Sequence, residues 1–100
     1  MATTTKALAR GAFGTGSATL YTVPASTTTV VSNIAITNTS GASQTFTLGL
    51  AGTALHTTTS ISANSTVYID LKQVLTATNT ITGLASATSV NYHISGVEIS

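Results

Sequence analysis

The chain has 100 residues, of which only 5% are charged, and its net charge at neutral pH is +1. The cations Lys6, Arg10 and Lys72 are too few for the basic patch that binds nucleic acid, so we expect no nucleic-acid partner. No apolar run approaches the length of a membrane-spanning helix, and we expect no membrane association. The chain has no cysteine, which excludes a disulfide framework and a thiolate metal site.

Threonine and serine together make up about a third of the residues, whereas Glu, Lys and Gln are scarce. Because threonine favours strands and the scarce residues favour helices, the composition predicts an all-β protein with one domain. With so few charges, a free monomer would have little protection against association. This favours a subunit that is covered by copies of itself or by a partner. A soluble β domain kept dispersed by hydroxyl groups is the alternative.

Residues 1–16 alternate only weakly, and Gly11, Gly14 and Gly16 follow one another at a spacing typical of a loop. We interpret residues 1–16 as an N-terminal arm, either extended against a neighbouring subunit or frayed. Residues 17–100 are then the β-sandwich domain. The start of the chain lacks an apolar signal region, so we expect synthesis in the cytoplasm without secretory export.

The longest alternating segment is Thr28–Asn38, and a second one follows at Ser43–Leu50. The turn residues of Asn38–Ala42 lie between them, so the two segments are predicted to pair as a hairpin. Before this hairpin, Ser17–Val23 is predicted to be a strand that ends at Pro24.

Further strands are predicted at intervals of about ten residues. They are Thr53–Thr58, continued by Ser60–Ala63, then Thr66–Leu71, Asn79–Leu84 and Val90–Ser100. Lys72–Thr76 is predicted to be a turn or a single helical turn. About seven or eight strands at this spacing indicate a single antiparallel β-sandwich or jelly roll. The apolar faces of the strands predict a core of Leu20, Val30, Ile34, Ile36, Phe46, Leu48, Val67, Ile69, Leu71, Ile81, Tyr92 and Ile94.

The last predicted strand changes its alternation at Ser95-Gly96. The apolar residues before this point have one parity, whereas Val97 and Ile99 have the other, and side chains of opposite parity lie on opposite faces of a strand. A bulge at the glycine would turn Val97 and Ile99 inward. Without a bulge they would point outward and form an apolar stripe at a subunit interface.

The titratable side chains predict no chemistry. His56 and His93 lie on separate predicted strands, and a zinc site needs three or four ligands, so we assign no metal and no cofactor. Asp70 and Glu98 occupy outward positions and are interpreted as solvated side chains. We assign no catalytic residue and predict that the chain is not an enzyme.

Tyr68 is the aromatic side chain that we expect to be exposed. It faces away from Val67 and Ile69, whereas Tyr92 occupies a core position. A carbohydrate-binding module that uses Tyr68 and nearby hydroxyl groups is therefore one functional hypothesis.

Four stretches of the chain form a distinctive set: Leu20–Ala25 (LYTVPA), Val30–Leu48 (VVSNIAITNTSGASQTFTL), Ser62–Leu71 (SANSTVYIDL) and Val90–Ser100 (VNYHISGVEIS). Together they resemble a family of small virion proteins of tailed bacteriophages. Members of this family are similar in having an early tyrosine-valine-proline turn, and they end in a strand that closes on SGVEI. The resemblance covers approximately residues 17–100 and implies a non-enzymatic structural component of the virion with no catalytic motif.

Members of the family occur on capsid surfaces and on tail or fibre assemblies, which leaves two further hypotheses. One is a capsid decoration or cement protein that binds the major capsid protein. The other is a tail or fibre accessory protein that contacts the host surface. In both cases we expect a protein made in the host cytoplasm and located in the virion. We also expect a homo-oligomer, with a trimer at local threefold positions as one arrangement.

Overall fold

The structure is a computed structural model that describes residues 3–100, which form eight β-strands and no helix. The strands are β1 (Thr3–Ala12), β2 (Ala18–Thr22), β3 (Thr28–Asn38), β4 (Gln44–Leu50), β5 (Thr53–Ile61), β6 (Thr66–Leu75), β7 (Thr80–Ala85) and β8 (Val90–Ile99). The predicted all-β fold is confirmed. The prediction of a turn or a single helical turn at Lys72–Thr76 is wrong, because Val74 and Leu75 pair with β3 and continue strand β6.

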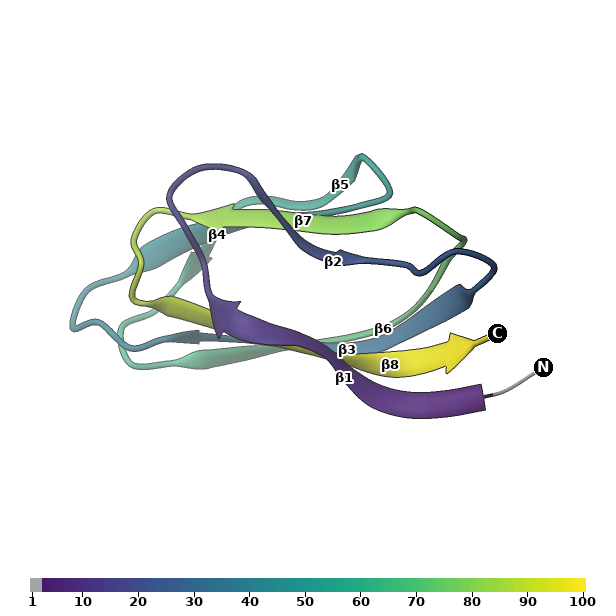
Figure 1. Cartoon of the computed structure of the whole chain (residues 1–100). Helices are drawn as coiled ribbons and strands as arrows, with labels where there is room; N and C mark the ends of the chain where they lie inside the picture. Colours follow the sequence, from purple (N-terminus) through teal and green to yellow (C-terminus); the bar gives the residue numbers. More distant parts are fainter. Residues whose placement is uncertain (1–2) are drawn as a thin grey trace.

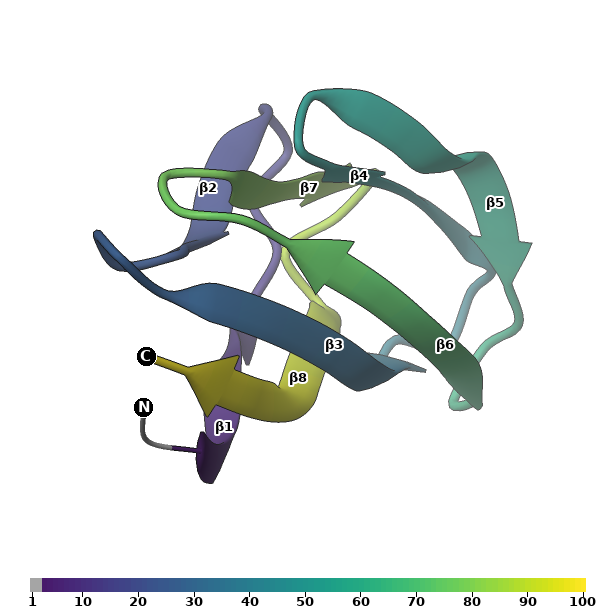
Figure 2. The same cartoon turned by 90° about the vertical axis from the view of Figure 1, so that its right-hand side faces the viewer.

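The strands form two antiparallel sheets that face each other (Figure 1). Sheet A has the strand order β1-β8-β3-β6, and sheet B has the order β2-β7-β4-β5. The chain crosses between the sheets at every connection except the one from β4 to β5. This connectivity is that of a jelly roll, so the predicted sandwich is confirmed. Strand β8 lies inside sheet A, and β1 begins beside the end of β8 (Figure 2).

The prediction that Thr28–Asn38 and Ser43–Leu50 form a hairpin is wrong. Their strands, β3 and β4, lie in different sheets, so the turn residues between them connect the two sheets. The hairpin is instead formed by β4 and β5, in which Leu50 is paired with Thr53. The intervening Ala51-Gly52 has φ angles of 53° and 81°, and two positive φ angles are the requirement of a type I′ turn.

Residues 3–12, which we predicted to belong to an N-terminal arm, form the edge strand β1. This strand pairs with β8 of the same chain. Phe13 follows directly and is only 1% exposed, and its ring centroid lies 5.0 Å from that of Tyr92. The segment therefore packs as part of the sandwich, and its contact with a neighbouring subunit stays a prediction. Met1 and Ala2 lie outside the described residues.

A line of β-bulges crosses sheet A beside Ser95-Gly96 of β8. The bulges lie in the neighbouring strands, where the pairing passes over Leu8 in β1 and Ser32 in β3. β6 inserts one further residue relative to β3 at the same level. β8 itself alternates without a bulge, so Val97 and Ile99 share the outer face with Ser95, as in the second of the two alternatives.

The bulge at Ser32 also means that the inward-pointing residues of β3 have opposite parity in the two halves of the strand. Val31 is 0% exposed and points into the core, whereas Val30 points outward. The prediction that Val30 is a core residue is therefore wrong, because the alternation was continued from Ile34 through the bulge. A single inserted residue exchanges the faces of all residues beyond it.

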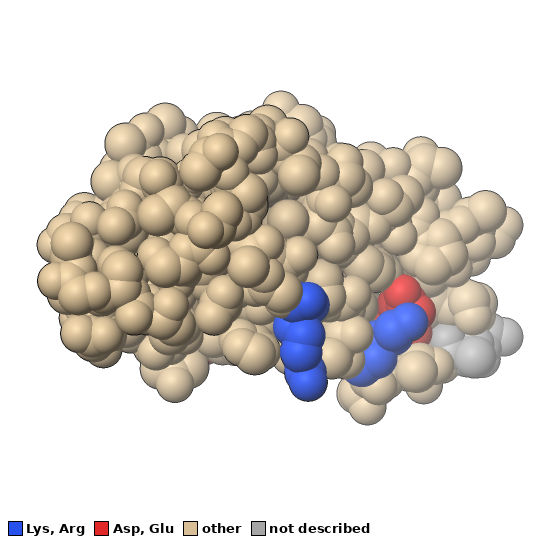
Figure 3. All heavy atoms as spheres, turned by 60° about the vertical axis from the view of Figure 1, so that its left-hand side comes forward, with Lys and Arg blue, Asp and Glu red and all other residues tan. Residues whose placement is uncertain are grey.

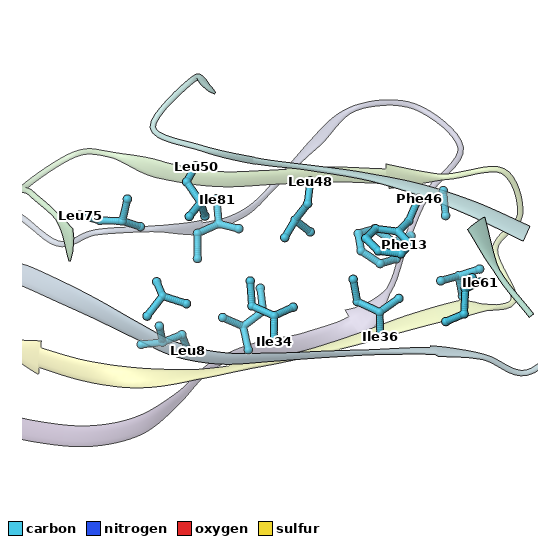
Figure 4. Packing of buried hydrophobic residues seen from close by; sticks show 14 of the residues in the cluster. Leu8, Phe13, Ile34, Ile36, Phe46, Leu48, Leu50, Ile61, Leu75 and Ile81 are labelled. Carbon is cyan, nitrogen blue, oxygen red and sulfur yellow. The ribbon is translucent and has the colours of Figure 1, made fainter. Parts of the chain in front are cut away.

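The core lies between the sheets and is built from both (Figure 4). Leu48, Leu50 and Ile81 of sheet B point toward side chains of sheet A that include Ile34 and Ile36. The predicted core residues Ile34, Ile36, Phe46, Leu48, Ile81 and Ile94 are buried, while Leu20, Val67, Ile69, Leu71 and Tyr92 are partly exposed and pack against the core. The core also contains Leu8, Phe13, Val23, Val31, Ile61, Leu75 and Val90, which the prediction missed.

Asn38 is a fully buried polar residue at the end of β3. Its side-chain nitrogen is 2.8, 3.2 and 3.2 Å from the carbonyl oxygens of Ala42, Ile61 and Ser62. Its side-chain oxygen accepts hydrogen bonds from the backbone nitrogen and the hydroxyl group of Ser40. One amide group thus joins the β3–β4 and β5–β6 connections, and its burial is compensated by these bonds.

Candidate functional site

The two histidines considered in the sequence lie in different sheets. His56 is on β5 of sheet B, whereas His93 is on β8 of sheet A. The His56 ring packs 5.6 Å from the ring of Phe46, and its Nδ1 atom is 3.4 Å from the Thr59 hydroxyl. Within residues 3–100, no group of three or more His, Cys, Asp or Glu residues could hold a metal ion.

We predicted that Glu98 projects into solvent, and this prediction is wrong. The Glu98 side chain is only 15% exposed and points toward sheet B, where it accepts a hydrogen bond from the Tyr21 hydroxyl. The Tyr21 hydroxyl is also 3.0 Å from Thr29 Oγ1, and Lys6 Nζ is 3.3 Å from Glu98 Oε1. The prediction was wrong because β8 continues without a bulge, which puts Glu98 on the inner face.

This cluster changes the acidity of its members. The hydrogen bond from Tyr21, with a smaller contribution from Lys6, lowers the pKa of Glu98 below its ordinary value. Burial, followed by the hydrogen bond to Glu98, raises the pKa of Tyr21. The cluster connects β2 of one sheet to β1, β3 and β8 of the other, so it is a polar clasp between the sheets. We call it the Tyr21–Glu98 clasp.

The outer face of sheet A is divided by the line of bulges into two surfaces. On the side near the chain ends, Val74 of β6, Val30 of β3 and Val97 of β8 are register neighbours. Val74 is 62% exposed, and Ile99 follows Val97 on the same face. Three adjacent strands thus present a continuous apolar surface, which we call the valine row (Val74, Val30, Val97).

On the other side of the bulges the outer face is polar and aromatic. Tyr68 of β6 is opposite Ala35 of β3, Ala35 is opposite His93 of β8, and His93 is opposite Arg10 of β1. Tyr68 is 71% exposed, as the sequence predicted. We call this set of four register neighbours the tyrosine row.

The polar side chains beside the tyrosine row are held by hydrogen bonds. Asn33 Nδ2 donates to Asp70 Oδ1 at 3.2 Å on one side of the row. On the other side, Thr37 Oγ1 and Thr66 Oγ1 are 3.1 Å apart. Both pairs join β3 to β6, so the exposed tyrosine lies between two ordered pairs of polar side chains.

The surface has shallow hollows at two places on this face. One, of about 320 Å³, is lined by Arg10, Gly11, Ala12, Asn91 and His93 at the β1–β8 end of the tyrosine row. Another is lined by Ser32, Asp70, Leu71 and Lys72 at the bulges. Neither hollow is deep enough to exclude water from a reaction, so both are suited to binding rather than to catalysis.

The outer face of sheet B differs from that of sheet A. A hollow of about 210 Å³ on this face is lined by Ser17, Thr47, Leu48, Gly49, Gly52, Thr53, Ala54, Thr82, Gly83 and Leu84. This lining offers hydroxyl and backbone groups and has no charged or aromatic side chain. Few residues of the chain are charged, and most of the surface drawn in Figure 3 belongs to other residues.

The sequence predicted the exposure of Tyr68 and, as one of two alternatives, the outward position of Val97 and Ile99, but it did not predict either row as a whole. The valine row was hidden because Val30 was assigned to the core, and because the exposed Val74 lay in a segment predicted to be a turn. The tyrosine row depends on which strands are neighbours, and the jelly-roll order brings together residues as distant in sequence as Arg10 and His93. The adjacent valines Val30 and Val31, with apolar residues on both parities, were the available signal of a bulge.

No protein-family model matches the chain, and no curated protein matches it. Among solved structures, two crystal structures of a pentameric capsid protein isolated from metagenomic phage sequences are similar, with 17% and 18% identity and a TM-score of 0.36. The match covers 90% of this chain, which spans 60% of the length of that protein. CBM35 from Paenibacillus barcinonensis matches at 9% identity and a TM-score of 0.40, covering 98% of this chain and 88% of that protein. At these values the structural similarity carries no argument about the function of this chain.

Within residues 3–100 no helix is long and apolar enough to span a membrane.

Proposed function

We propose that this chain is a non-enzymatic structural protein of a tailed-phage virion, which decorates and stabilises the capsid. The observation that carries the proposal is the valine row, an apolar surface on a chain with very few charges. The resemblance of Val30–Leu48 and Val90–Ser100 to small phage virion proteins supports the same function. Jelly rolls serve in viral capsids and in lectins alike, so the fold itself does not distinguish these functions.

The valine row has the properties of a docking surface for another virion protein. Its side chains are β-branched and belong to paired strands, so they lose little conformational entropy when they are covered. Charged residues are depleted at the centres of protein interfaces, and Val74, Val30 and Val97 form an uncharged centre. We assign the major capsid protein as the partner that binds this surface. Further copies of the chain would bind at equivalent positions of the capsid.

Each copy can bind weakly in such an arrangement. A lattice of many equivalent sites holds an oligomer by several contacts at once, which increases the overall affinity without new contacts. A homo-oligomer, for example a trimer at local threefold positions, would use this effect.

Immunogold labelling of intact particles tests the location. We expect label over the whole capsid shell. Label confined to the tail would overturn the capsid assignment in favour of a tail or fibre accessory protein.

Reconstitution tests the surface. Particles treated to shed the protein should lose resistance to osmotic shock and heat, and should regain it when the wild-type chain is added. Val74→Glu places a charge in the valine row and should abolish rebinding. Ser60→Glu, an equivalent change at an exposed position of sheet B, should rebind normally. Equal rebinding of both variants would contradict docking by the valine row.

A further inference from the structure

We propose that the tyrosine row is a binding site for a neutral oligosaccharide, which lies across β6, β3 and β8 with a pyranose ring stacked on Tyr68. This site is separate from the valine row and does not depend on attachment to a virion. It would give the protein a second function, which is to bind glycans on a surface that the protein contacts.

The first observation is the exposure of Tyr68. A tyrosine side chain has a large apolar ring, and 71% of its surface is accessible here although it lies in a strand that is paired with β3. The register neighbour of Tyr68 on β3 is Ala35, whose methyl group leaves room beside the ring. An aromatic ring with an open face is the group on which the apolar face of a pyranose stacks.

The second observation is the set of polar groups beside the ring. Side chains alternate along a strand, so Thr66 and Asp70 lie on the same face as Tyr68, each about 6–7 Å along β6. Asp70 is hydrogen-bonded to Asn33, and Thr66 to Thr37. A carboxylate beside an amide offers acceptors and donors together, which is what neighbouring sugar hydroxyls require.

These groups are ordered before any ligand binds. All of them lie on paired strands, and the hydrogen bonds between β3 and β6 restrict their rotamers further. A preorganised site loses less conformational entropy on binding than a flexible loop would. This matters for a shallow site, because the energy gained from a single stacked ring is small.

The site is long enough for more than one sugar. His93 is two strands away from Tyr68, which corresponds to about 10 Å at the usual strand spacing. This is about the length of a disaccharide. The hollow lined by Arg10, Asn91 and His93 lies at that end and provides space and hydrogen-bonding groups for the next sugar.

The charges beside the tyrosine row favour a neutral ligand. Asp70 lies next to Tyr68 along β6 and would repel an anion at the stacking position, whereas Arg10 is at the far end of the row. A docking protein is disfavoured because the row offers one exposed aromatic ring flanked by polar groups rather than a continuous apolar area. The valine row, on the same sheet, offers that apolar area.

The experiment is a glycan array probed with the full chain, followed by titration of the neutral oligosaccharide that binds best. We expect Tyr68→Ala to weaken binding by about tenfold or more and Tyr68→Phe, which keeps the ring, to retain most of it. Asp70→Ala should also weaken binding. Val74→Ser, at an exposed position on the same strand but in the valine row, is the matched control and should bind as the wild type does.

Backbone amide shifts in an NMR titration add a readout that does not depend on any substitution. We expect the largest shifts at Tyr68, Ala35 and His93. The absence of any neutral glycan ligand, binding that Tyr68→Ala leaves unchanged, or binding to acidic glycans alone would each overturn the proposal. A failure of the capsid assignment, in contrast, would appear in the labelling experiment and would leave these results unaffected.

Discussion

The carbonyl oxygen of Val30 on β3 occupies the space beside Gly96 on β8 where a β-carbon would lie. The side chain of Leu8 closes the same space from β1, with its Cδ1 atom 3.0 Å from that position. The bulges in β3 and β1 thus bring two neighbouring strands close to the backbone of β8. Glycine is required here because of this close approach and not because of its φ angle.

Gly96→Ala should therefore destabilise the fold. The added methyl group would meet a backbone carbonyl, which cannot rotate away, and overpacking of this kind typically costs about 1–3 kcal/mol. Chemical denaturation of the purified variant measures the change in the free energy of unfolding. Gly41→Ala is the matched control, since a β-carbon at Gly41 would meet no atom within 4 Å. Equal stability of the two variants would contradict the close approach.

Phe13→Ala tests whether the start of the chain belongs to the sandwich. Phe13 is buried, lies beside Tyr92, and covers Gly83 of β7. Loss of a buried phenylalanine side chain should cost about 3–5 kcal/mol, the same range that we expect for Phe46→Ala in the centre of the core. Thermal and chemical denaturation measure both changes. A frayed segment would instead make Phe13→Ala nearly neutral, as we expect for Thr15→Ala at an exposed position.

The sequence was sufficient for most of the strands, although not for β1 or the end of β6, and it was not sufficient for their partners. Alternation in Thr28–Asn38 and Gln44–Leu50 identifies two strands correctly, yet the same pattern fits a hairpin and a connection between two sheets. Pairing depends on contacts that are distant in sequence, and these have no local signature. The true hairpin turns at Ala51-Gly52, between two segments that we did not predict to pair.

The bulges explain the errors in the assignment of faces. Inner and outer residues alternate regularly within each half of β3, but the parity of the inner face changes at Ser32. Because the alternation was continued from Ile34 across this point, Val30 was assigned to the wrong face. Glu98 was misplaced in the same way, because a bulge in the neighbouring strands was attributed to β8. The candidate surfaces depend on these details, so Tyr68 could be predicted as exposed whereas the valine row could not.

Asn38→Ala should destabilise the fold although it changes a residue that the sequence indicates as part of a turn. The substitution removes the hydrogen bonds that Asn38 Nδ2 donates to the carbonyl oxygens of Ala42, Ile61 and Ser62. It also removes the acceptor of two hydrogen bonds from Ser40. At about 1 kcal/mol for each bond, and more for an unpaired buried group, we expect a loss of roughly 2–4 kcal/mol. Denaturation measures it, and Asn91→Ala, at a partly exposed position of sheet A, should cost much less.

The Tyr21–Glu98 clasp predicts how stability depends on pH. Because the pKa of Glu98 is lowered from 4.5 in the folded chain, the carboxylate contributes stability above that pH. As the pH falls below it, the unfolded chain takes up the proton first, and the contribution is lost as the pH reaches the folded pKa. The pKa of Tyr21 is raised from 10.0, so its contribution is present below pH 10.0 and is lost as the pH rises through the folded value.

Denaturation midpoints measured across the acid and alkaline ranges check both signs. Glu98→Gln should flatten the loss of stability on the acid side, because the side chain can no longer be protonated. Tyr21→Phe should flatten the loss on the alkaline side and weaken the acid dependence, since the hydrogen bond from Tyr21 is the largest cause of the lowered pKa of Glu98. Lys6→Ala should have a smaller effect, because Lys6 is 46% exposed and its ion pair is screened by water and salt. An acid dependence that is identical in the wild type and Glu98→Gln would show that the clasp does not connect the sheets in solution.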